Sequence, residues 1–563
     1  MRSFVLPLAV ALGRRRLGKA NLSKLNLLLR SFVLPLADAL GRRRLGKANL
    51  SKLNLLLRSF VLPLADALGR RRLGKANLSK LNLLLRSACT TFAHMDALEF
   101  AERIVLNLPY DPNEQQVQLI AALARFCSPL SPSDSIFMLN GYAGTGKTSL
   151  TGALVRSLNE VGISSVLLAP TGRAAKVFAR FAKHPAYTIH RKIYRQESSG
   201  DATSYISSLA ENRHHNTVFI VDEASMIGSR SDNGNDLLED LIQYVYTGDN
   251  CRLILLGDTA QLPPVGCQFS PAMTVNVLKT YGLRVTRATL TATARQASDS
   301  GILYNATWLR RAMLTDPLPT PQLVATNFAD VTPVLSEDLV EVLNDAYSRD
   351  GIEETILITR SNSRAVKFNL AIRNTILEKE EYLCKDEYIL VAKNNYLWSA
   401  KVKGVDFIAN GDVALVTKIY GTETKYGFLF ADAKILLPDR DIELEAKLLL
   451  STLASDAPGL TPEQAETLYR KCLNDPNEFA PEVPMATRLR KLKTNPYYNA
   501  LQVKYAYAVT CHKAQGGQWK NVFIDMGYIA PEAQGIEFYR WLYTAITRAT
   551  HHLYLINPSV EVK

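Results

Sequence analysis

The sequence predicts an α/β protein with two parallel sheets, small inserted subdomains and a basic repeat segment in front of them. The first observation is a series of short apolar runs from about residue 95 onwards. These runs lack polar alternation, as strands do when helices cover both faces of a parallel sheet. The second is that helical patterns separate the runs. The third is the length of 563 residues, which suggests three or four domains.

Four apolar runs predict the strands of the first sheet. They are "SIFML" (135–139), "SSVLLA" (164–169), "TVFIV" (217–221) and "RLILL" (252–256). After the first run, Leu150, Leu154 and Leu158 recur at four-residue spacing, which predicts a helix that packs on this sheet.

A second group of runs predicts another parallel sheet in the C-terminal half. It consists of "TILIT" (355–359), "KYAYAVT" (504–510), "NVFID" (521–525) and "HLYLIN" (552–557). Residues 413–497 lie between these runs and combine short strand patterns with the acidic helical stretch "TPEQAETLYRKCL". This segment is predicted to be an inserted subdomain.

The N-terminal segment, residues 2–85, contains three near-identical copies of a 28-residue unit. A leucine-rich repeat is rejected because Arg30 stands where that repeat needs Asn or Cys. The absence of an apolar run of about 18 residues excludes a membrane span. We expect residues 1–94 to be a non-catalytic extension, with Met95 as an alternative start. A targeting segment or a polyanion-binding arm remains the alternative.

The net charge of +13 comes from these repeats. Residues 2–86 hold 19 Lys and Arg against two acids, which leaves 47 bases and 51 acids in the rest of the chain. A polyanion must therefore bind in a local groove of the body. The seven cysteines form no CxxC pair, so neither a disulfide framework nor a zinc knuckle is expected, and a reducing cytoplasm fits best.

The stretch "GYAGTGKT" matches the phosphate-binding loop G-x-x-x-x-G-K-[ST]. Its glycines let successive backbone amides point at phosphate oxygens, and the helix that follows offers its positive N-terminus. Lys147 is expected to reach the β and γ phosphates, and the Thr148 hydroxyl to ligate Mg²⁺. The predicted nucleotide-binding residues of the loop are Gly141, Gly144, Thr145, Gly146, Lys147 and Thr148.

Two further runs end in polar residues. "FIVDEAS" places Asp222 and Glu223 directly after a strand. Beside a phosphate loop, Asp222 is expected to support Mg²⁺ and Glu223 to polarise the attacking water. The alternative is that these acids only cap a helix. "GDTAQLPPVG" places Asp258 and Gln261 after the next strand. The Gln261 amide can contact the γ phosphate, while an incidental Pro-rich turn is the alternative.

Together these motifs resemble the superfamily 1 DNA helicases, most closely their RecD-like and Dda-like branch, over residues 110–560. "NEQQ" resembles the family's adenine-reading motif, which implies a contact of Gln116 with the base. "TARQ" and "LYTAITRA" resemble the elements that supply arginines to the γ phosphate. The resemblance thus implies that ATP and Mg²⁺ are the cofactors and that the catalytic residues are Lys147, Glu223, Gln261, Arg295 and Arg548.

The same resemblance implies a groove for single-stranded DNA. It rests on "APTGRAAK", "TIHR", "TRSNSRAVKFNLAIR" and "VTCHKAQGGQW", and it implies that the DNA contacts are Thr171, His190, Asn362, Thr510, His512 and Lys513. Hydroxyls, amides and a lysine suit phosphate contacts that do not read sequence. His190 and His512 lack metal-ligand company, so zinc is not expected.

The resemblance also implies a domain plan of two RecA-like P-loop domains. The first spans 95–300 with a small insertion at 193–215, and the second combines 301–412 with 498–563; the 413–497 insert would be SH3-like. The insertion falls where the family has a strand-separating hairpin. No clear wedge phenylalanine appears there, and the only candidates are Tyr194, Tyr205 and Ile206.

The predicted function is that of an ATP-dependent DNA helicase that translocates 5′ to 3′ on single-stranded DNA. An RNA or RNA–DNA helicase, a P-loop ATPase that remodels without unwinding, and a scaffold subunit with a vestigial site are the alternatives. The expected partners are single-stranded DNA, duplex junctions and single-stranded-DNA-binding or repair proteins, with no membrane. A monomer associated with the nucleoid is expected in DNA repair or recombination, and organelle targeting by the repeats stays open.

Overall fold

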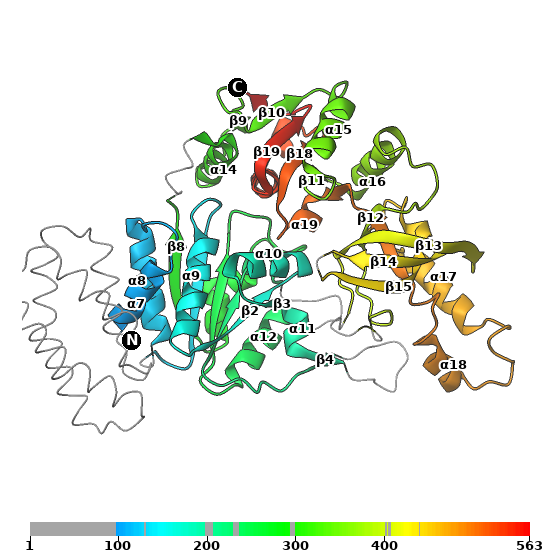
Figure 1. Ribbon diagram of the computed structural model, residues 1–563, viewed down its shortest axis with the longest axis horizontal. Helices are drawn as coiled ribbons and strands as arrows, with labels where there is room; N and C mark the ends of the chain where they lie inside the picture. The colour runs from blue at the N-terminus through cyan, green and yellow to red at the C-terminus, as the bar shows by residue number, and fades with distance from the viewer. Residues whose placement is uncertain are drawn as a thin grey trace, which may run out of the picture. The chain divides into compact units, whose positions relative to one another are not determined.

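The computed structural model describes residues 97–128, 131–196, 207–228, 236–292, 299–399, 402, 407–438 and 440–563 (Figure 1). The repeats, Met95, Arg295, Tyr205 and Ile206 lie outside the described residues. No helix in the described ranges is long and apolar enough to cross a membrane.

The first parallel sheet has six strands in the order β3-β2-β6-β7-β1-β8. The strands are β1 (Ser135–Gly141), β2 (Ser164–Ala169), β3 (Ala186–Thr188), β6 (Thr217–Val221), β7 (Arg252–Gly257) and β8 (Arg284–Leu290). The four predicted strands are confirmed. The sequence missed β3, which has three residues, and β8, an edge strand with mostly exposed or half-buried side chains.

Helices cover this sheet, and together they form lobe 1. They include α7 (Ala97–Leu106), α8 (Glu114–Cys127), α9 (Lys147–Glu160), α10 (Gly172–Ala182) and α12 (Leu237–Tyr246). The predicted leucine stripe of α9 is confirmed, because Leu150, Leu154 and Leu158 are all buried. A hairpin of β4 (Tyr194–Gln196) and β5 (Ser207–Leu209) lies within the predicted 193–215 insertion.

The second parallel sheet has the order β10-β19-β18-β11-β17 and forms lobe 2 with its helices. The strands are β10 (Val331–Val334), β11 (Thr355–Thr359), β17 (Ala508–Thr510), β18 (Trp519–Asp525) and β19 (Ala549–Ile556). The main helices are α14 (Gly301–Ala312), α15 (Leu339–Asp350), α16 (Asn362–Ala371), α19 (Cys511–Ala514) and α20 (Ile536–Ile546). Two parallel sheets with covering helices confirm the predicted fold class.

A closed barrel of five strands joins lobe 2. It consists of β12 (Glu387–Val391), β13 (Val413–Lys425), β14 (Phe428–Leu437), β15 (Ile442–Leu449) and β16 (Leu501–Tyr505), with α17 (Pro462–Leu473) and α18 (Met485–Leu492) between the last two. The single strand predicted at 504–510 is wrong, because the chain leaves the barrel at Tyr505 and enters the parallel sheet at Ala508. The barrel also takes strands from both sides of the 413–497 segment, since β12 and β16 close it.

Candidate functional site

The loop between β1 and α9 has the backbone that its glycines predict. Gly144 and Gly146 both adopt the left-handed region, with φ of 73° and 79°, where residues with a Cβ are strained. The Lys147 ammonium donates to the carbonyls of Gly141 (3.2 Å) and Gly257 (3.4 Å). The loop and the end of β7 thus hold the lysine between them, at the N-terminus of α9 where an anion is favoured.

Gln116 supports the phosphate loop through a hydrogen bond to its backbone. Its Nε2 donates to the Thr145 carbonyl at 3.0 Å, and its Oε1 accepts from the Asn113 amide at 3.1 Å. The side chain is buried, and both of its polar atoms have protein partners. The structure therefore gives Gln116 a direct role in fixing the phosphate loop, and its contact with adenine stays a prediction.

Asp222 and Glu223 follow β6 at the same edge of the sheet. Burial raises the pKa of Asp222 to about 6, against the opposing charge of Lys147. Glu223 adopts φ 52°, which costs a residue with a Cβ about 1 kcal/mol or more. Among the described residues, the buried Oε2 of Glu223 and Oε1 of Gln261 have no hydrogen-bond partner. A buried acceptor without a partner needs an explanation, and a ligand or water bound at that atom is one.

Lobe 2 contributes Arg548 to this edge. Its guanidinium is 4% exposed and lies 3.9 Å from Glu223 Oε1. It donates to the carbonyls of Thr544 (3.0 Å) and Gly517 (3.3 Å), which fix its direction. The structure thus brings Arg548 together with Lys147, Asp222 and Glu223 from lobe 1, while Arg295 lies outside the described residues.

Two side chains of lobe 2, Tyr543 and Arg310, make contacts across the lobes that were not predicted. The Ala143 amide of the phosphate loop donates to the Tyr543 hydroxyl at 3.0 Å, and that hydroxyl donates to Asp258 Oδ2 at 2.6 Å. The guanidinium of Arg310 on α14 stacks over the ring of Tyr142 at 4.4 Å. Tyr543 stands in the quoted stretch "LYTAITRA", so its closeness to Arg548 in sequence could have marked it.

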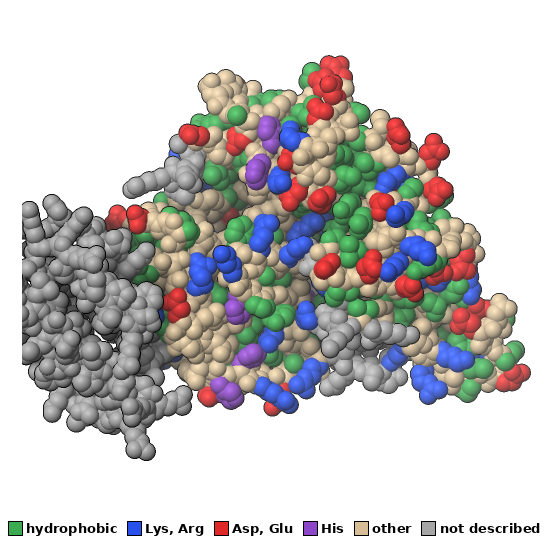
Figure 2. Space-filling view, in the orientation of Figure 1, with side chains coloured by type: hydrophobic (Ala, Val, Ile, Leu, Met, Phe, Trp, Pro, Cys, Tyr) green, Lys and Arg blue, Asp and Glu red, His purple; other side chains and the backbone are tan. Residues whose placement is uncertain are grey.

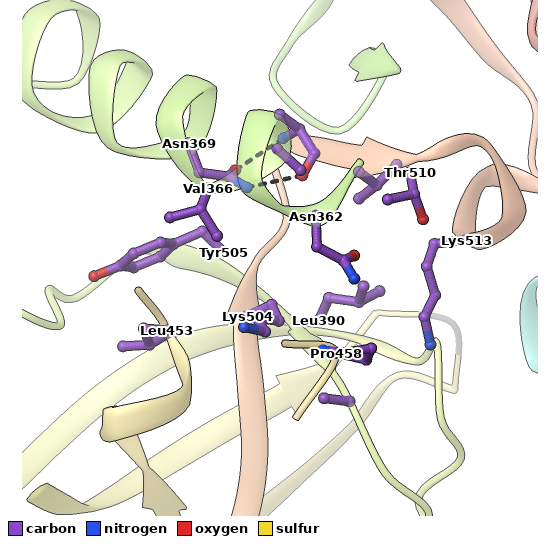
Figure 3. Close-up of a pocket in the computed structure, with 14 residues that line it drawn as sticks. Asn362, Val366, Asn369, Leu390, Leu453, Pro458, Lys504, Tyr505, Thr510 and Lys513 are labelled. Atoms are coloured by element: carbon purple, nitrogen blue, oxygen red, sulfur yellow. Dashed lines mark hydrogen bonds between the residues drawn. The ribbon is translucent and has the colours of Figure 1, made fainter. Parts of the chain in front are cut away.

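The residues predicted to contact DNA lie partly on lobe 1 and partly on lobe 2. Asn362, Thr510 and Lys513 of lobe 2 line one pocket, together with Lys504 of the barrel (Figure 3). His512 is exposed on α19 next to it. In lobe 1, Thr171 caps α10 by accepting from the Ala174 amide at 3.2 Å. The His190 ring packs against Tyr194 at 5.6 Å between centroids.

Tyr194 is the one wedge candidate that the structure describes. Its hydroxyl donates to Asp240 Oδ2 of α12 at 2.6 Å, and its ring packs against the core of lobe 1. A side chain held in this way is a packing residue of the hairpin base and is not free to enter a duplex.

A larger cavity of about 930 Å³ lies between α10 and the first residues of β11, β18 and β19. None of the predicted site residues lines it. Figure 2 shows Lys and Arg side chains gathered over α10 on this face, and Arg173 of that helix stacks over Trp519 of lobe 2 at 4.5 Å. This cation–π contact is a further direct link between the lobes.

Family models match the segments that build the two halves of the site. A model described as an AAA domain matches residues 112–313, and one described as a UvrD-like helicase C-terminal domain matches residues 505–556. The ATP-dependent RecD2 DNA helicase of Deinococcus radiodurans is 32% identical over 130 residues, 23% of this chain and 16% of that protein. The ATP-dependent DNA helicase dda of Enterobacteria phage T4 is 25% identical over 259 residues, 45% of this chain and 55% of that protein.

The chain belongs to the superfamily 1 helicases. The helicase is also 22% identical over 489 residues to the uncharacterized protein R530 of Acanthamoeba polyphaga mimivirus, 74% of this chain and 94% of that protein. A solved structure of Pif1 helicase from Bacteroides in complex with ADP-AlF3 and ssDNA aligns with a TM-score of 0.40 and 14% identity, covering 80% of this chain and 92% of that chain.

The family assignment confirms the resemblance inferred from the motifs, and it makes the protein an ATP-hydrolysing enzyme. Sequence reasoning missed three residues that lie beside the predicted site residues: Tyr543, Arg310 and Lys504. Lys504 was missed because its strand was predicted to belong to the parallel sheet, whereas it lies in β16 of the barrel and lines the same pocket as Asn362.

Proposed function

We propose that this helicase translocates on single-stranded DNA in the 5′-to-3′ direction and unwinds duplexes as it moves. The observation that carries the proposal is the meeting of both lobes at one site, with Arg548 of lobe 2 at 3.9 Å from Glu223 of lobe 1. Hydrolysis at such a site changes the contact between the lobes, and DNA bound to both lobes is moved as a result.

The roles at the ATP site follow from the chemistry of each group. The amides of residues 141–148 and Lys147 bind the phosphates. Glu223 orients and deprotonates the attacking water, and Gln261 contacts the γ phosphate. Arg548, with Arg295, neutralises the charge that develops on the transferred phosphoryl group.

Mg²⁺ fits the donors that the chain offers. The Thr148 hydroxyl and the Asp222 carboxylate are hard oxygen ligands of the kind that Mg²⁺ prefers. Burial that disfavours the Asp222 carboxylate would be offset by a cation at that place. When bound with ATP, the ion supplies charge neutralisation of the phosphates.

For the DNA groove, Asn362, Thr510, His512 and Lys513 would contact phosphates from lobe 2, and Thr171 and His190 from lobe 1. The shared pocket of Asn362, Thr510 and Lys513 supports the first set. The direction of movement is taken from the resemblance to the RecD-like and Dda-like branch. We extend the proposal to action at duplex junctions in repair or recombination, as a monomer, alongside single-stranded-DNA-binding or repair proteins.

An unwinding assay with 5′-tailed and 3′-tailed duplexes tests this function. We expect ATP-dependent strand separation of the 5′-tailed substrate only, and stimulation of ATP hydrolysis by single-stranded DNA above that by RNA of the same sequence. Lys147→Ala serves as the inactive control. Equal unwinding of both substrates overturns the direction. Stimulation by RNA alone favours the RNA helicase, and hydrolysis indifferent to either nucleic acid favours a remodelling ATPase.

A further inference from the structure

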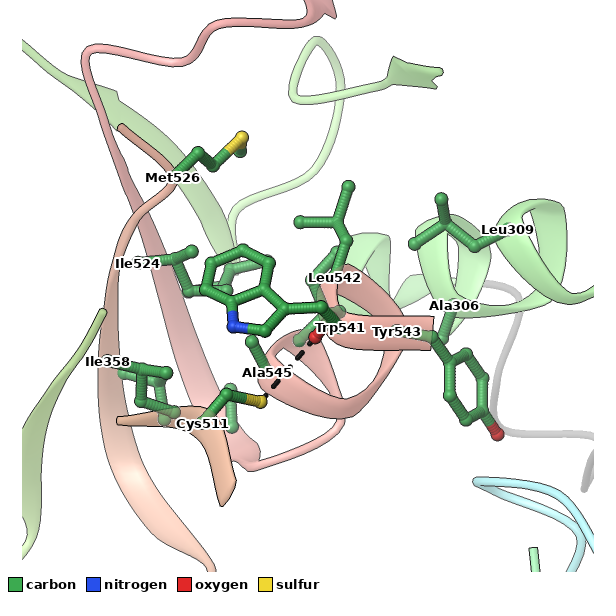
Figure 4. Close-up of a cluster of buried hydrophobic side chains, with 14 of the residues drawn as sticks. Ala306, Leu309, Ile358, Cys511, Ile524, Met526, Trp541, Leu542, Tyr543 and Ala545 are labelled. Atoms are coloured by element: carbon green, nitrogen blue, oxygen red, sulfur yellow. Dashed lines mark hydrogen bonds between the residues drawn. The ribbon is translucent and has the colours of Figure 1, made fainter. Parts of the chain in front are cut away.

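Tyr543 is a buried side chain of lobe 2 whose polar end lies in lobe 1. Its ring is 1% exposed, and Figure 4 shows it on α20, directed away from the Trp541 and Ile524 side of the apolar cluster. The next residue, Thr544, also reaches lobe 1, because its hydroxyl accepts from the Leu262 amide at 2.8 Å. One turn of α20 therefore holds two separate loops of the other lobe.

Those two loops are the ones that surround the phosphates in the proposed site. Ala143 belongs to the phosphate loop, and Asp258 and Leu262 flank Gln261 in the loop after β7. The Tyr543 hydroxyl accepts from the first loop and donates to the second. Among side chains of this size and shape only tyrosine can do both, since phenylalanine has no hydroxyl.

Loss of the Tyr543 hydroxyl should be costly because its partner Asp258 is buried. Its carboxylate is 1% exposed; one oxygen accepts from the Ala260 amide at 2.9 Å, and the other accepts from Tyr543. Loss of the tyrosine hydroxyl leaves a buried carboxylate oxygen and the Ala143 amide without these partners. A hydrogen bond to a charged, buried group contributes more than a neutral one, and its loss is felt wherever the two lobes must meet.

We propose that Tyr543 is a positioning residue that couples closure of the two lobes to the phosphate-binding and Gln261 loops. The inference rests on the proposed function and adds to it a specific connection. Movement of either loop on binding or losing the γ phosphate would be passed to α20, and so to Arg548 five residues further along the chain. Tyr543 itself makes no contact with ATP in this role.

Tyr543→Phe tests the coupling with almost no change in volume. We expect the turnover number of ATP hydrolysis to fall about ten- to hundredfold, while the dissociation constant for ADP stays within about threefold. Closure is measured directly by energy transfer between dyes on the exposed positions Glu160 of lobe 1 and Glu341 of lobe 2. A non-hydrolysable ATP analogue should increase the transfer in the parent protein and leave it unchanged in the variant.

Tyr539→Phe is the matched control. Tyr539 lies one turn earlier on α20, is equally buried, and donates its hydroxyl to the Pro319 carbonyl within lobe 2. The Tyr539→Phe variant should lose about as much stability as Tyr543→Phe, and it should keep the parent's turnover number and its closure with the ATP analogue. Thr544→Val is a second test of the same connection and should reduce closure in the same direction.

Normal turnover and normal closure in both Tyr543→Phe and Thr544→Val overturn the inference. If Tyr543→Phe fails to fold, closure in Thr544→Val decides. If nucleic acid does not stimulate ATP hydrolysis by the parent protein, the proposed function is contradicted but the role of Tyr543 is not. The closure measurement needs only the ATP analogue, so it still tests whether Tyr543 connects the lobes.

Discussion

Glu223 is the residue on which turnover should depend most. It stands in a strained left-handed conformation with one buried oxygen unpaired among the described residues and the other 3.9 Å from Arg548. Backbone strain of this kind persists where the surrounding structure fixes a side chain for function. An acceptor that is buried, fixed and unpaired suits a group that binds and deprotonates water.

We expect Glu223→Gln to bind ATP with unchanged affinity and to lose about 10²- to 10⁴-fold in turnover, the usual contribution of a general base. Equilibrium binding of a fluorescent ATP analogue and single-turnover hydrolysis measure the two quantities. Glu211→Gln, a surface change that removes an exposed ion pair with Arg213, is the control and should behave as the parent. Rapid hydrolysis by Glu223→Gln would refute the assignment.

Lys504 should make nucleic-acid binding sensitive to pH. Burial lowers the pKa of Lys504 to about 8, and Asp456 acts in the opposite direction. The ammonium therefore loses its proton as pH rises through about 8, whereas the unfolded chain keeps it to about 10. Because this pKa is depressed in the folded state, burial of the charge costs stability below pH 8, and that cost is relieved between about pH 8 and 10.

If Lys504 contacts DNA beside Lys513, the affinity for single-stranded DNA should fall about three- to fivefold between pH 7 and pH 9. This change corresponds to the loss of one exposed ion pair, which contributes up to about 1 kcal/mol to binding. Lys504→Arg keeps its charge over this range and should show a flatter profile. Fluorescence anisotropy with a labelled oligonucleotide at constant ionic strength measures both. Parallel profiles for the two proteins would exclude Lys504 from the contact.

At the scale of elements, a buried ion pair fixes the start of the barrel. Arg373 lies in the π-helical turn Ile372–Ile376 that follows α16, and Glu387 begins β12; both side chains are almost fully buried. The guanidinium also stacks on Tyr505 of β16 at 4.3 Å. One arginine thus joins the helix of lobe 2 to the two strands that close the barrel.

Glu387→Ala should lower the free energy of unfolding by about 3–5 kcal/mol, because it leaves a buried guanidinium without its partner. Urea denaturation measures the change. The control is Glu443→Ala, which removes a half-exposed pair with Lys434 and should cost less than about 1 kcal/mol. Equal costs for the two variants would mean that water reaches Arg373 in the folded protein.

At the scale of the whole molecule, residues Asp96–Lys563 form one compact unit. Its first helix, α7, packs against α8 and α9 with Phe100 and Ile104 buried. The Asn107 side chain donates to Ser157 at 2.9 Å, which ties the end of α7 to the helix that carries the phosphate loop.

Removal of residues 1–94 should therefore leave ATP hydrolysis, with and without single-stranded DNA, within about twofold of the full chain. Removal of residues 1–106 deletes α7, exposes the apolar surface of α8 and α9, and should lower the midpoint of thermal unfolding by several degrees. Both truncations are assayed side by side. A large loss of activity in the shorter truncation would mean that the repeats take part in the reaction.

Much of this fold could be predicted from local sequence. Apolar runs identified the central strands of both sheets. The motifs that follow strands predicted Lys147, Asp222 and Glu223 for one site, and the family resemblance of "LYTAITRA" added Arg548 to that prediction. The edge strands β3 and β8 were not predicted, because short or exposed strands have no continuous apolar run in the sequence.

The sequence by itself determined the class of protein and the chemical groups at the ends of its strands, because these are properties of short, contiguous segments. Only the tertiary structure decided which groups meet. The contact of Ala143 with Tyr543 joins residues 400 positions apart, and the barrel closes through strands more than a hundred residues apart. Such pairings depend on how whole lobes pack, and no local pattern of residues encodes the partner at the other end.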